Sequence, residues 1–185
     1  MARNNRDREE SGLPGGDAGR TRGAAGSEDQ RESQFTVPQA SPERCRDIMT
    51  KDPACCLPID STAKAAQLMR DHNVGIVPVV RTKQDKDLVG VVTDRDLTLA
   101  VVAEGRDPDL TTVESVMSHP PVVCSPDDVY QKVLRTMERL QLRRVPAVDY
   151  AGRLVGMVSQ ADIALRVKDS KQTAGMMREI SRPAA

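Results

Sequence analysis

The feature that most constrains this chain is an internal repeat. The segment LVGVVTDRD at Leu88–Asp96 recurs as LVGMVSQAD at Leu154–Asp162. In each copy a short, β-branched apolar run ends on a hydroxyl residue, and an aspartate follows three positions later. Such a run is typical of a buried strand, and the leucines and valines after it recur at helical spacing. Each copy therefore predicts a strand that turns directly into a helix, with a hydroxyl and a carboxylate at the junction.

The repetition extends far beyond these nine residues, and repeats of this kind decide an architecture. Met49, Asp60, Met69 and Pro78 each recur as the same residue type 68 positions later. The offset becomes 66 after a polar turn that is two residues shorter in the second copy. One unit of about 55 residues is thus used twice. Because so small a unit buries its apolar face poorly by itself, we expect the two units to pack on each other.

Each unit is expected to run helix, strand, helix, strand, strand, helix. In the first unit we expect a short helix from a Ser41 N-cap through Ile48 and then a strand at 54–57. A helix at 62–73, capped by Asp60 or Ser61, should follow. The unit should end with strands at 76–80 and 88–93 and a helix from Asp94. In the second we expect a helix at 129–141, strands at 144–148 and 154–159, and a helix from Gln160. Pro78 and Pro146 inside the paired strands indicate an edge or a bulge.

The two ends of the chain differ from the repeats. Residues 1–40 are polar, mix both charges and have no apolar period, so we expect a disordered arm. The predicted organisation is a disordered arm at 1–40, a first repeat at 41–106, a second repeat at 107–168 and a C-terminal tail at 169–185. A further helix is expected in that tail before Pro183.

Composition excludes several classes of protein. Lysine plus arginine equals aspartate plus glutamate at 27 each, so the chain lacks the electrostatic footprint of a nucleic-acid-binding protein. Aromatic residues make up 2% of the chain, too few for base-stacking platforms. No apolar run approaches the ~18 residues of a membrane span, and the N-terminus lacks an apolar signal region. We expect a cytoplasmic protein without nucleic-acid or membrane partners.

Catalytic and metal-binding signatures are also missing from the sequence. It contains no P-loop, GxGxxG, GxSxG or HExxH motif, and its two histidines form no recognisable nucleophile–base pair, so an enzyme is not expected. The four cysteines include no CxxC pair, which disfavours a zinc site. Cys56 and Cys124 match across the repeats and are interpreted as small buried thiols. Cys55 should face the other side of its strand, where a redox role stays open.

With these residues in view, the chain resembles a tandem pair of CBS domains, the Bateman module, from Arg44 to about Val167. The resemblance rests on the leading IMT and VMS, the VPVV and VPAV strands, and LVGVVTDRDL with LVGMVSQADI. It is strongest toward small stand-alone bacterial CBS-pair proteins without a catalytic domain. The resemblance implies an α/β fold of two units related by a pseudo-twofold axis, with packed sheets and two clefts between the units.

In similar modules the clefts bind adenosyl ligands such as AMP, ADP, ATP or S-adenosylmethionine. The resemblance implies that Thr93 with Asp96, and Ser159 with Asp162, supply the hydroxyl and the carboxylate. A carboxylate suits this role because it only accepts hydrogen bonds and can take both hydroxyls of a ribose. The alternative is that each motif is a capping box, which stabilises a helix start without any ligand.

The two repeats differ in charge at the entry to the second strand of each unit. The first repeat has Gly75–Ile76 there, whereas the second has Arg143–Arg144. Similar modules that bind nucleotides often place a basic residue at this point, and a guanidinium can hold phosphate oxygens in pairs. The alternative is that one of the two, such as Arg143, is a solvated surface residue.

Two functional classes remain. The first is a non-catalytic sensor that requires no cofactor, binds an adenosyl ligand, and signals through an unidentified regulated protein or its own homodimer. The alternative is a structural, dimerising module with empty or degenerate clefts. We expect a homodimer in both cases, because the apolar residues of 96–103 and 129–141 are too numerous for one buried face each.

Overall fold

The structure is a computed structural model of the chain, and it describes residues 44–166 and Gly175. These residues all fall in the second of the two units into which the chain divides. The expected disordered arm at 1–40, the Ser41 cap and the helix expected in the C-terminal tail lie outside the described residues.

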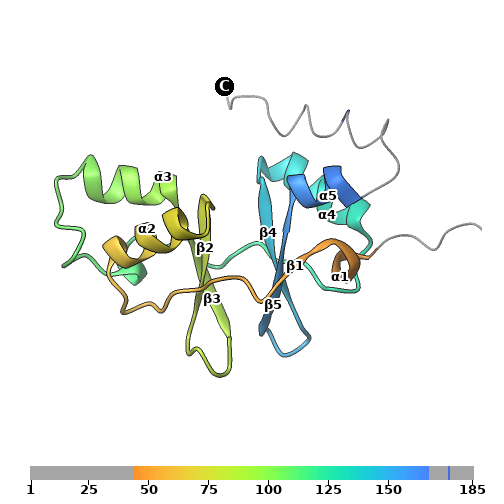
Figure 1. Cartoon of the computed structure of the whole chain (residues 1–185), viewed down its shortest axis with the longest axis horizontal. Coiled ribbons are helices and arrows are strands. Elements are labelled where there is room, and N and C mark those ends of the chain that lie inside the picture. Colours follow the sequence, from red (N-terminus) through yellow and green to blue (C-terminus); the bar gives the residue numbers. More distant parts are fainter. Residues whose placement is uncertain (1–43, 167–174, 176–185) are drawn as a thin grey trace, which may run out of the picture. The chain divides into compact units, whose positions relative to one another are not determined.

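The unit is an α/β structure in which two similar sets of elements follow each other (Figure 1). The first set comprises α1 (Cys45–Ile48), β1 (Thr50–Lys51), α2 (Thr62–Asp71), β2 (Ile76–Val80), β3 (Leu88–Thr93), α3 (Asp94–Leu97) and the π-helical η1 (Thr98–Val102). The second comprises the 3-10 helix η2 (Val113–Ser115), α4 (Tyr130–Leu140), β4 (Arg144–Val148), β5 (Leu154–Ser159) and α5 (Gln160–Arg166). The predicted α/β class is confirmed, and so are the predicted bounds of β2, β3, β4 and β5.

The strands form two sheets that repeat the same geometry. In one sheet β2 pairs antiparallel with β3, and in the other the order is β1-β5-β4. The β2–β3 register shifts between Val79 and Val80, and the β4–β5 register shifts at the matching place, between Ala147 and Val148. Pro78 and Pro146 lie next to these irregularities, as the prolines predicted.

The strand expected at 54–57 is wrong. Within that segment only Cys56 pairs, through one parallel bridge to Val79, and Cys124 makes the matching bridge to Ala147. The Cys56 amide donates to the Pro78 carbonyl at 3.1 Å, and the Val80 amide donates to the Cys56 carbonyl at 3.0 Å. Prolines at positions 53 and 58 flank this residue and lack the N–H groups that a longer ladder would need.

Two helix boundaries also differ from the sequence expectation. The helix expected at 62–73 ends at Asp71, and Asn73 beyond it has a left-handed backbone with φ 52°. Its N-cap is Ser61, whose hydroxyl accepts from the Lys64 amide at 3.3 Å. The helix expected at 129–141 begins at Tyr130 and ends at Leu140, because Gln141 takes the left-handed conformation that ends a helix.

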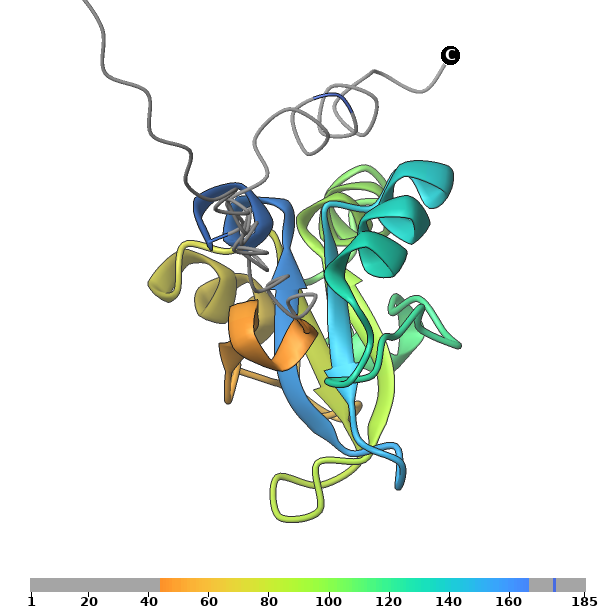
Figure 2. The same cartoon turned by 90° about the vertical axis from the view of Figure 1, so that its right-hand side faces the viewer.

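The leading segment of each repeat packs on the other repeat. Cys45 and Ile48 of α1 are buried in a core cluster with side chains of α4, β4, β5 and α5. Val113 of η2 is buried in the cluster of α2, β2 and β3. β1 extends the second sheet, with Thr50 opposite Met157, while Ser118 bridges to Val91 of the first. Both views show α1 beside β5 (Figures 1 and 2). The sequence repeat alone did not predict this exchange.

A methionine–glycine contact holds each exchanged segment close to its sheet. A Cβ built on Gly156 would lie 2.5 Å from Met49 Sδ and 3.0 Å from the Thr50 carbonyl oxygen. A Cβ on Gly90 would lie 2.8 Å from Met117 Sδ and 3.0 Å from the Ser118 carbonyl oxygen. Glycine is therefore required at both positions for the leading backbone to approach its strand.

The change Gly156→Ala should destabilise the fold by about 1–3 kcal/mol, because Met49 can move but the Thr50 backbone cannot move without breaking the β1–β5 pairing. Urea unfolding measures the difference. Gly175→Ala is the control, since no described residue lies within 4 Å of a Cβ there. An unchanged unfolding midpoint for Gly156→Ala would contradict the close approach.

Matching carboxylates fix the turns that precede α2 and α4. Asp60 accepts from the Leu57 amide at 2.9 Å and from Lys64 Nζ at 2.6 Å. Asp128 accepts from the Ser125 amide at 2.9 Å and from Lys132 Nζ at 2.7 Å. Burial raises the pKa of each carboxyl, but these hydrogen bonds together hold both pKa values below their ordinary range.

Carboxyls with lowered pKa values contribute stability that is complete above their unfolded pKa of ~3.9 and is lost as the pH falls through the lower folded pKa. The free energy of unfolding should therefore drop below about pH 5, and Asp60→Asn with Asp128→Asn should make this drop shallower. Denaturant unfolding between about pH 6 and pH 3 measures it. The exposed Asp109→Asn is the control, and an equal slope in all variants would be the contrary result.

Candidate functional site

The first repeated motif forms the junction between β3 and α3. Thr93 Oγ1 accepts from the Asp96 amide at 3.1 Å, which caps the helix. In return Asp96 Oδ2 accepts from the Thr93 amide at 2.9 Å and from the Thr93 hydroxyl at 2.8 Å. Thr93 is in extended backbone geometry, as an N-cap residue must be. The alternative interpretation of the motif as a capping box is therefore present in the structure.

The second motif repeats this geometry where β5 enters α5. Ser159 Oγ accepts from the Asp162 amide at 3.1 Å, and Asp162 Oδ2 accepts from the Ser159 amide at 3.0 Å and its hydroxyl at 2.6 Å. Both aspartates thus use only Oδ2 for the cap. Among the described residues, no hydrogen bond engages Oδ1 of Asp96 or Asp162. Capping and ligand binding can therefore share one carboxylate.

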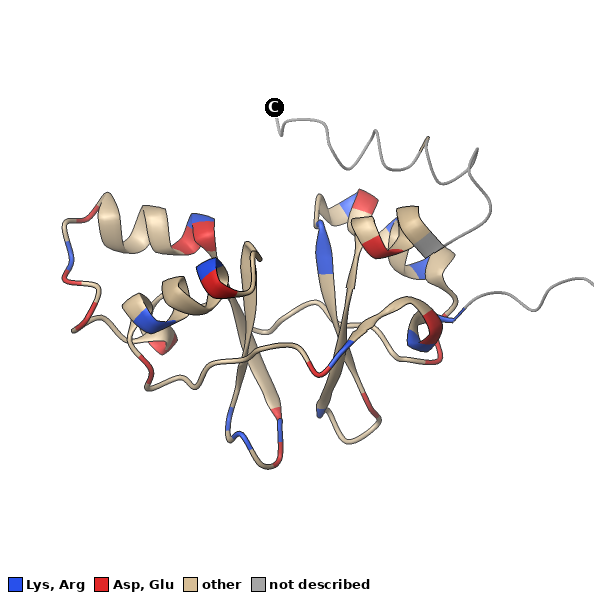
Figure 3. Ribbon diagram, viewed as in Figure 1, with Lys and Arg blue, Asp and Glu red and all other residues tan. Residues whose placement is uncertain are grey.

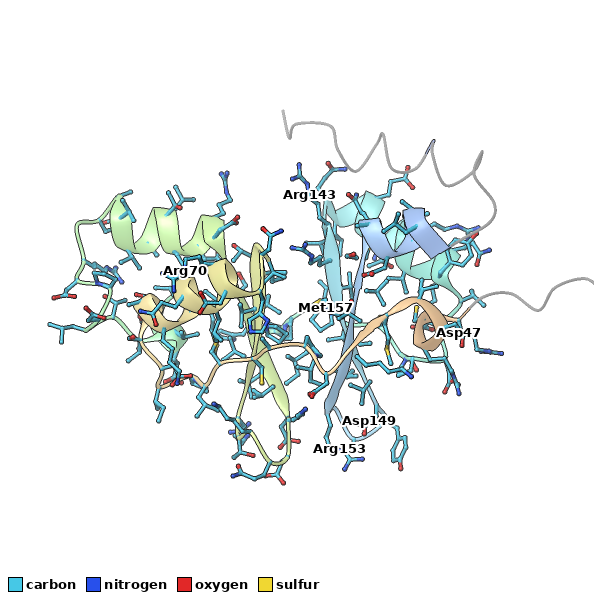
Figure 4. The ribbon with its side chains drawn as sticks, viewed as in Figure 1. Asp47, Arg70, Arg143, Asp149, Arg153 and Met157 are labelled. Atoms are coloured by element: carbon cyan, nitrogen blue, oxygen red, sulfur yellow. The ribbon has the colours of Figure 1, made fainter. Side chains whose placement is uncertain are left out.

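The first cleft is a cavity of about 450 Å³ between the leading segment, β2 and the second sheet. Its polar lining includes Ser159 and Asp162 from the second motif and Arg144 from β4. Its remaining walls are mainly apolar, with Met157 on β5 lying between the two sheets (Figure 4). The lining residues are Thr50, Asp52, Pro53, Ala54, His72, Val74, Ile76, Pro78, Arg144, Met157, Ser159 and Asp162.

The second cleft, of about 650 Å³, lies where the two strand–helix junctions face each other. It is lined by Gly75, Ile76, Thr93, Asp94, Arg95, Gln141, Leu142, Arg143, Arg144, Ser159, Gln160 and Ala161. The two clefts adjoin, because Ile76, Arg144 and Ser159 line both. At its wall, Gln160 Nε2 is buried and has no hydrogen-bond partner among the described residues.

The six residues singled out in the sequence do not form two equal sites. Ser159, Asp162 and Arg144 come together in the first cleft, while Thr93, Arg143, Arg144 and Ser159 come together in the second. Asp96 is not among the residues that line either cleft. The second motif is thus exposed to a cavity through its carboxylate, whereas the first contributes only its hydroxyl residue.

Charge also divides the two clefts. The second is lined by three arginines, Arg95, Arg143 and Arg144, against the single carboxylate of Asp94. Arg143 projects at the end of β4, and basic residues mark that end of the strand (Figures 3 and 4). In the first repeat the position that matches Arg143 is Gly75. It has little room for a side chain, since a Cβ there would lie 2.9 Å from Asp94 Oδ2. The second cleft is therefore the more basic of the two, and most of its positive charge comes from the second repeat.

Three polar residues that line the first cleft were not identified from the sequence, namely Thr50, Asp52 and His72. Thr50 and Asp52 reach the cleft because the leading segment crosses to the second sheet, and Asp52 forms an ion pair with Lys86. His72 is the C-cap residue of α2. Only knowledge of the exchange would have identified the positions in the leading segment.

Among residues 44–166, no group of three or more His, Cys, Asp or Glu side chains is placed to hold a metal ion. Within that range, too, no helix has the length and apolar character needed to cross a membrane. Burial raises the pKa of the Cys56 thiol to about 12, which leaves it protonated at neutral pH.

Sequence comparison identifies the class of protein to which this fold and these clefts correspond. The family model described as the CBS domain matches residues 45–103 and 113–169. The chain therefore belongs to the CBS-domain family and contains a tandem CBS pair. These matches begin at α1 and η2, the two segments that exchange between the repeats.

Individual relatives agree with this assignment. The chain is 35% identical to the uncharacterized protein YlbB of Bacillus subtilis over 138 residues, which are 75% of this chain and 91% of that protein. A crystal structure of Hypoxic Response Protein I with two coordinated zinc ions matches with a TM-score of 0.60 and 35% identity, over 68% of this chain and 99% of that one. The CBS pair of protein MJ0100, in complex with 5′-methylthioadenosine and S-adenosyl-L-methionine, matches with a TM-score of 0.60 and 28% identity, over 68% of this chain and 95% of that one.

Proposed function

We propose that this CBS pair is a non-catalytic sensor that binds an adenosyl ligand in the first cleft and signals its occupancy through a regulated protein or its own homodimer. The observation that carries the proposal is that Oδ1 of Asp162 accepts no hydrogen bond from the described residues. This carboxylate lines a cavity of about 450 Å³ while its other oxygen caps α5. The volume lies within the range of small-molecule sites, roughly 300–1,000 Å³.

The lining of the first cleft suits the parts of an adenosine. Asp162 Oδ1 can accept hydrogen bonds from a ribose diol, and such charge-assisted bonds are stronger than neutral ones. Ile76, Pro78 and Met157 provide apolar surface for a flat base. The MJ0100 pair, which is in complex with two adenosyl compounds, supports the same class of ligand for this chain. AMP, ADP, ATP and S-adenosylmethionine remain the candidates.

The adjoining second cleft favours ligands that carry phosphate. Arg144 lines both clefts, and Arg143 and Arg95 line the second alone. Guanidinium groups hold phosphate oxygens in pairs. A nucleotide seated with its ribose at Asp162 would direct its phosphates toward Arg144.

The structural alternative applies most strongly to the first motif. Its capping box accounts fully for Thr93 and Asp96, and Asp96 does not line either cleft. We therefore propose that Asp162 binds ligand and that Asp96 stabilises α3 alone. The two motifs share a hydroxyl residue followed by an aspartate three positions later, and they serve as matched test and control.

Asp162→Ala should weaken adenosyl binding by ten- to a hundredfold, because the lost charge-assisted hydrogen bonds contribute about 1.5–3 kcal/mol. Asp96→Ala removes an equivalent cap, worth about 0.5–2 kcal/mol of stability, and should leave affinity unchanged. Isothermal titration with AMP, ADP, ATP and S-adenosylmethionine measures both. The sensor proposal fails if the wild type binds none of them, or if both variants bind as the wild type does.

We also propose that the chain forms a homodimer through its helices. Several helical apolar side chains are exposed: Leu99 and Val102 of η1, Leu140 of α4 and Leu165 of α5. Val102 is 74% exposed, and an apolar surface of this kind favours association with a second copy.

Light scattering should give a dimer mass for the wild type and a monomer mass for Val102→Asp, because the carboxylate would be buried in the interface. Tyr150→Asp, in the turn between β4 and β5, is the control for a fully exposed residue away from these helices and should stay dimeric. A wild type that is monomeric at micromolar concentration would exclude the homodimer.

A further inference from the structure

Two cysteines that are distant in sequence meet in the core of the second repeat. Cys45 of α1 is 0% exposed, Cys124 is 6% exposed, and both belong to one core cluster. Their side chains interact with each other, and both thiols are free. The backbone fixes this meeting on each side: the Cys45 amide donates to the Asp128 carbonyl at 2.9 Å, and the Cys124 amide donates to the Pro146 carbonyl at 2.9 Å.

Packing alone does not require a thiol pair at this place. Val113, which lies 68 positions after Cys45, is its match in the repeat and is buried in the same cluster as Cys56. Cys56 in turn matches Cys124, and no other cysteine belongs to its cluster of described residues. The same core position is thus filled by a valine in one repeat and by a second cysteine in the other.

The pair is reachable by a small oxidant. A cavity of about 60 Å³ is lined by Cys124, Val133 and Thr136, among others, and has room for a molecule of the size of water or peroxide. On the other side, Cys45 is the first residue of a helix of only four residues. Its side chain is fully buried, so the cavity beside Cys124 is the route by which a small oxidant reaches the pair.

We propose that Cys45 and Cys124 are a redox-active dithiol, which a hydroperoxide oxidises to an intramolecular disulfide that fastens α1 to the second repeat. In the first step a cysteine thiolate attacks one peroxide oxygen, the O–O bond breaks, and a sulfenic acid and water form after proton transfer. In the second step the other thiol attacks the sulfenic sulfur, the S–S bond forms, and a second water leaves. Two thiols and one hydrogen peroxide give one disulfide and two waters, with two electrons passing from sulfur to oxygen.

The surroundings of the two thiols shift their pKa values in opposite directions. The hydrogen bond from Cys124 lowers the pKa of Cys45 despite its burial and the nearby Asp128 and Asp47 carboxylates, and Lys132 acts in the same lowering direction. That hydrogen bond and burial raise the pKa of Cys124. The lowered pKa of Cys45 favours its thiolate, whereas Cys124 is the thiol that lines the cavity.

The disulfide would restrain the exchanged segment. α1 leads directly into Met49 and β1, which packs on β5 through Gly156. A bond between Cys45 and Cys124 closes a long loop of the chain, and cross-links of long loops restrict the unfolded state most.

The test uses the full chain, treated with hydrogen peroxide and digested without reduction. Mass spectrometry should find a peptide joining Cys45 to Cys124, lighter by two hydrogens than the separate thiol peptides. The melting temperature should rise by about 5–15 °C on oxidation and return with dithiothreitol. Cys45→Val, which copies Val113 of the matching position, should fold and lose both effects.

A cysteine introduced into the core of the first repeat provides a matched gain-of-function variant. Val113→Cys introduces a thiol into the cluster of Cys56 and should add a second cross-link, from Cys56 to the introduced thiol, under the same treatment, whereas wild-type Cys56 stays reduced. The proposal is overturned if Cys45 and Cys124 remain thiols at peroxide doses that oxidise the half-exposed Cys55, or if the products are intermolecular or over-oxidised instead.

Discussion

The fold depends on the exchange of leading segments between the repeats. α1 and β1 complete the core and sheet of the second repeat, and η2 completes the core of the first. Met49 against Gly156 and Met117 against Gly90 set the distance at which each segment approaches its strand. Because the segment that completes the second sheet includes Thr50 and continues into Asp52, the same exchange builds one wall of the first cleft. The stability of the fold and the shape of that cleft therefore rely on one set of contacts.

The duplicated units keep the same framework and differ in their chemistry. Both retain a capping box, a carboxylate that fixes the turn before the long helix, and a register shift at the end of the paired strands. They differ at the entry to the second strand of each unit. The first repeat has Gly75 there, close to Asp94, whereas the second has Arg143, which lines the second cleft together with Gln160. They differ again where Cys45 in one core is matched by Val113 in the other. Most of the proposed phosphate contacts thus come from the second repeat, and the proposed thiol chemistry lies in the core around β4 and β5.

Local patterns predicted local structure well. The bounds of four strands were predicted to the residue, at 76–80, 88–93, 144–148 and 154–159. A β-branched run bounded by turn residues strongly favours a strand. The strand expected at 54–57 was wrong, since alternation of side chains cannot show that only Cys56 finds a partner. The candidate residues Thr93, Ser159, Asp162, Arg143 and Arg144 do line clefts, but Asp52 and His72 were missed. A repeat pattern predicts the structure of the unit. It does not predict which repeat each leading segment packs on, because that depends on long-range packing.

The exchange can be measured directly by methyl NOEs in solution. Ile48 is buried with Val158 and Ile163 in the second repeat's core, whereas Val77 and Val92 lie in the first repeat's core. With isoleucine and valine methyl groups labelled, Ile48 should show NOEs to Val158 or Ile163, and Val113 should show them to Val77 or Val92. NOEs from Ile48 to Val77 or Val92 instead would mean that each repeat keeps its own leading segment, and would contradict both the fold and the cleft built on it.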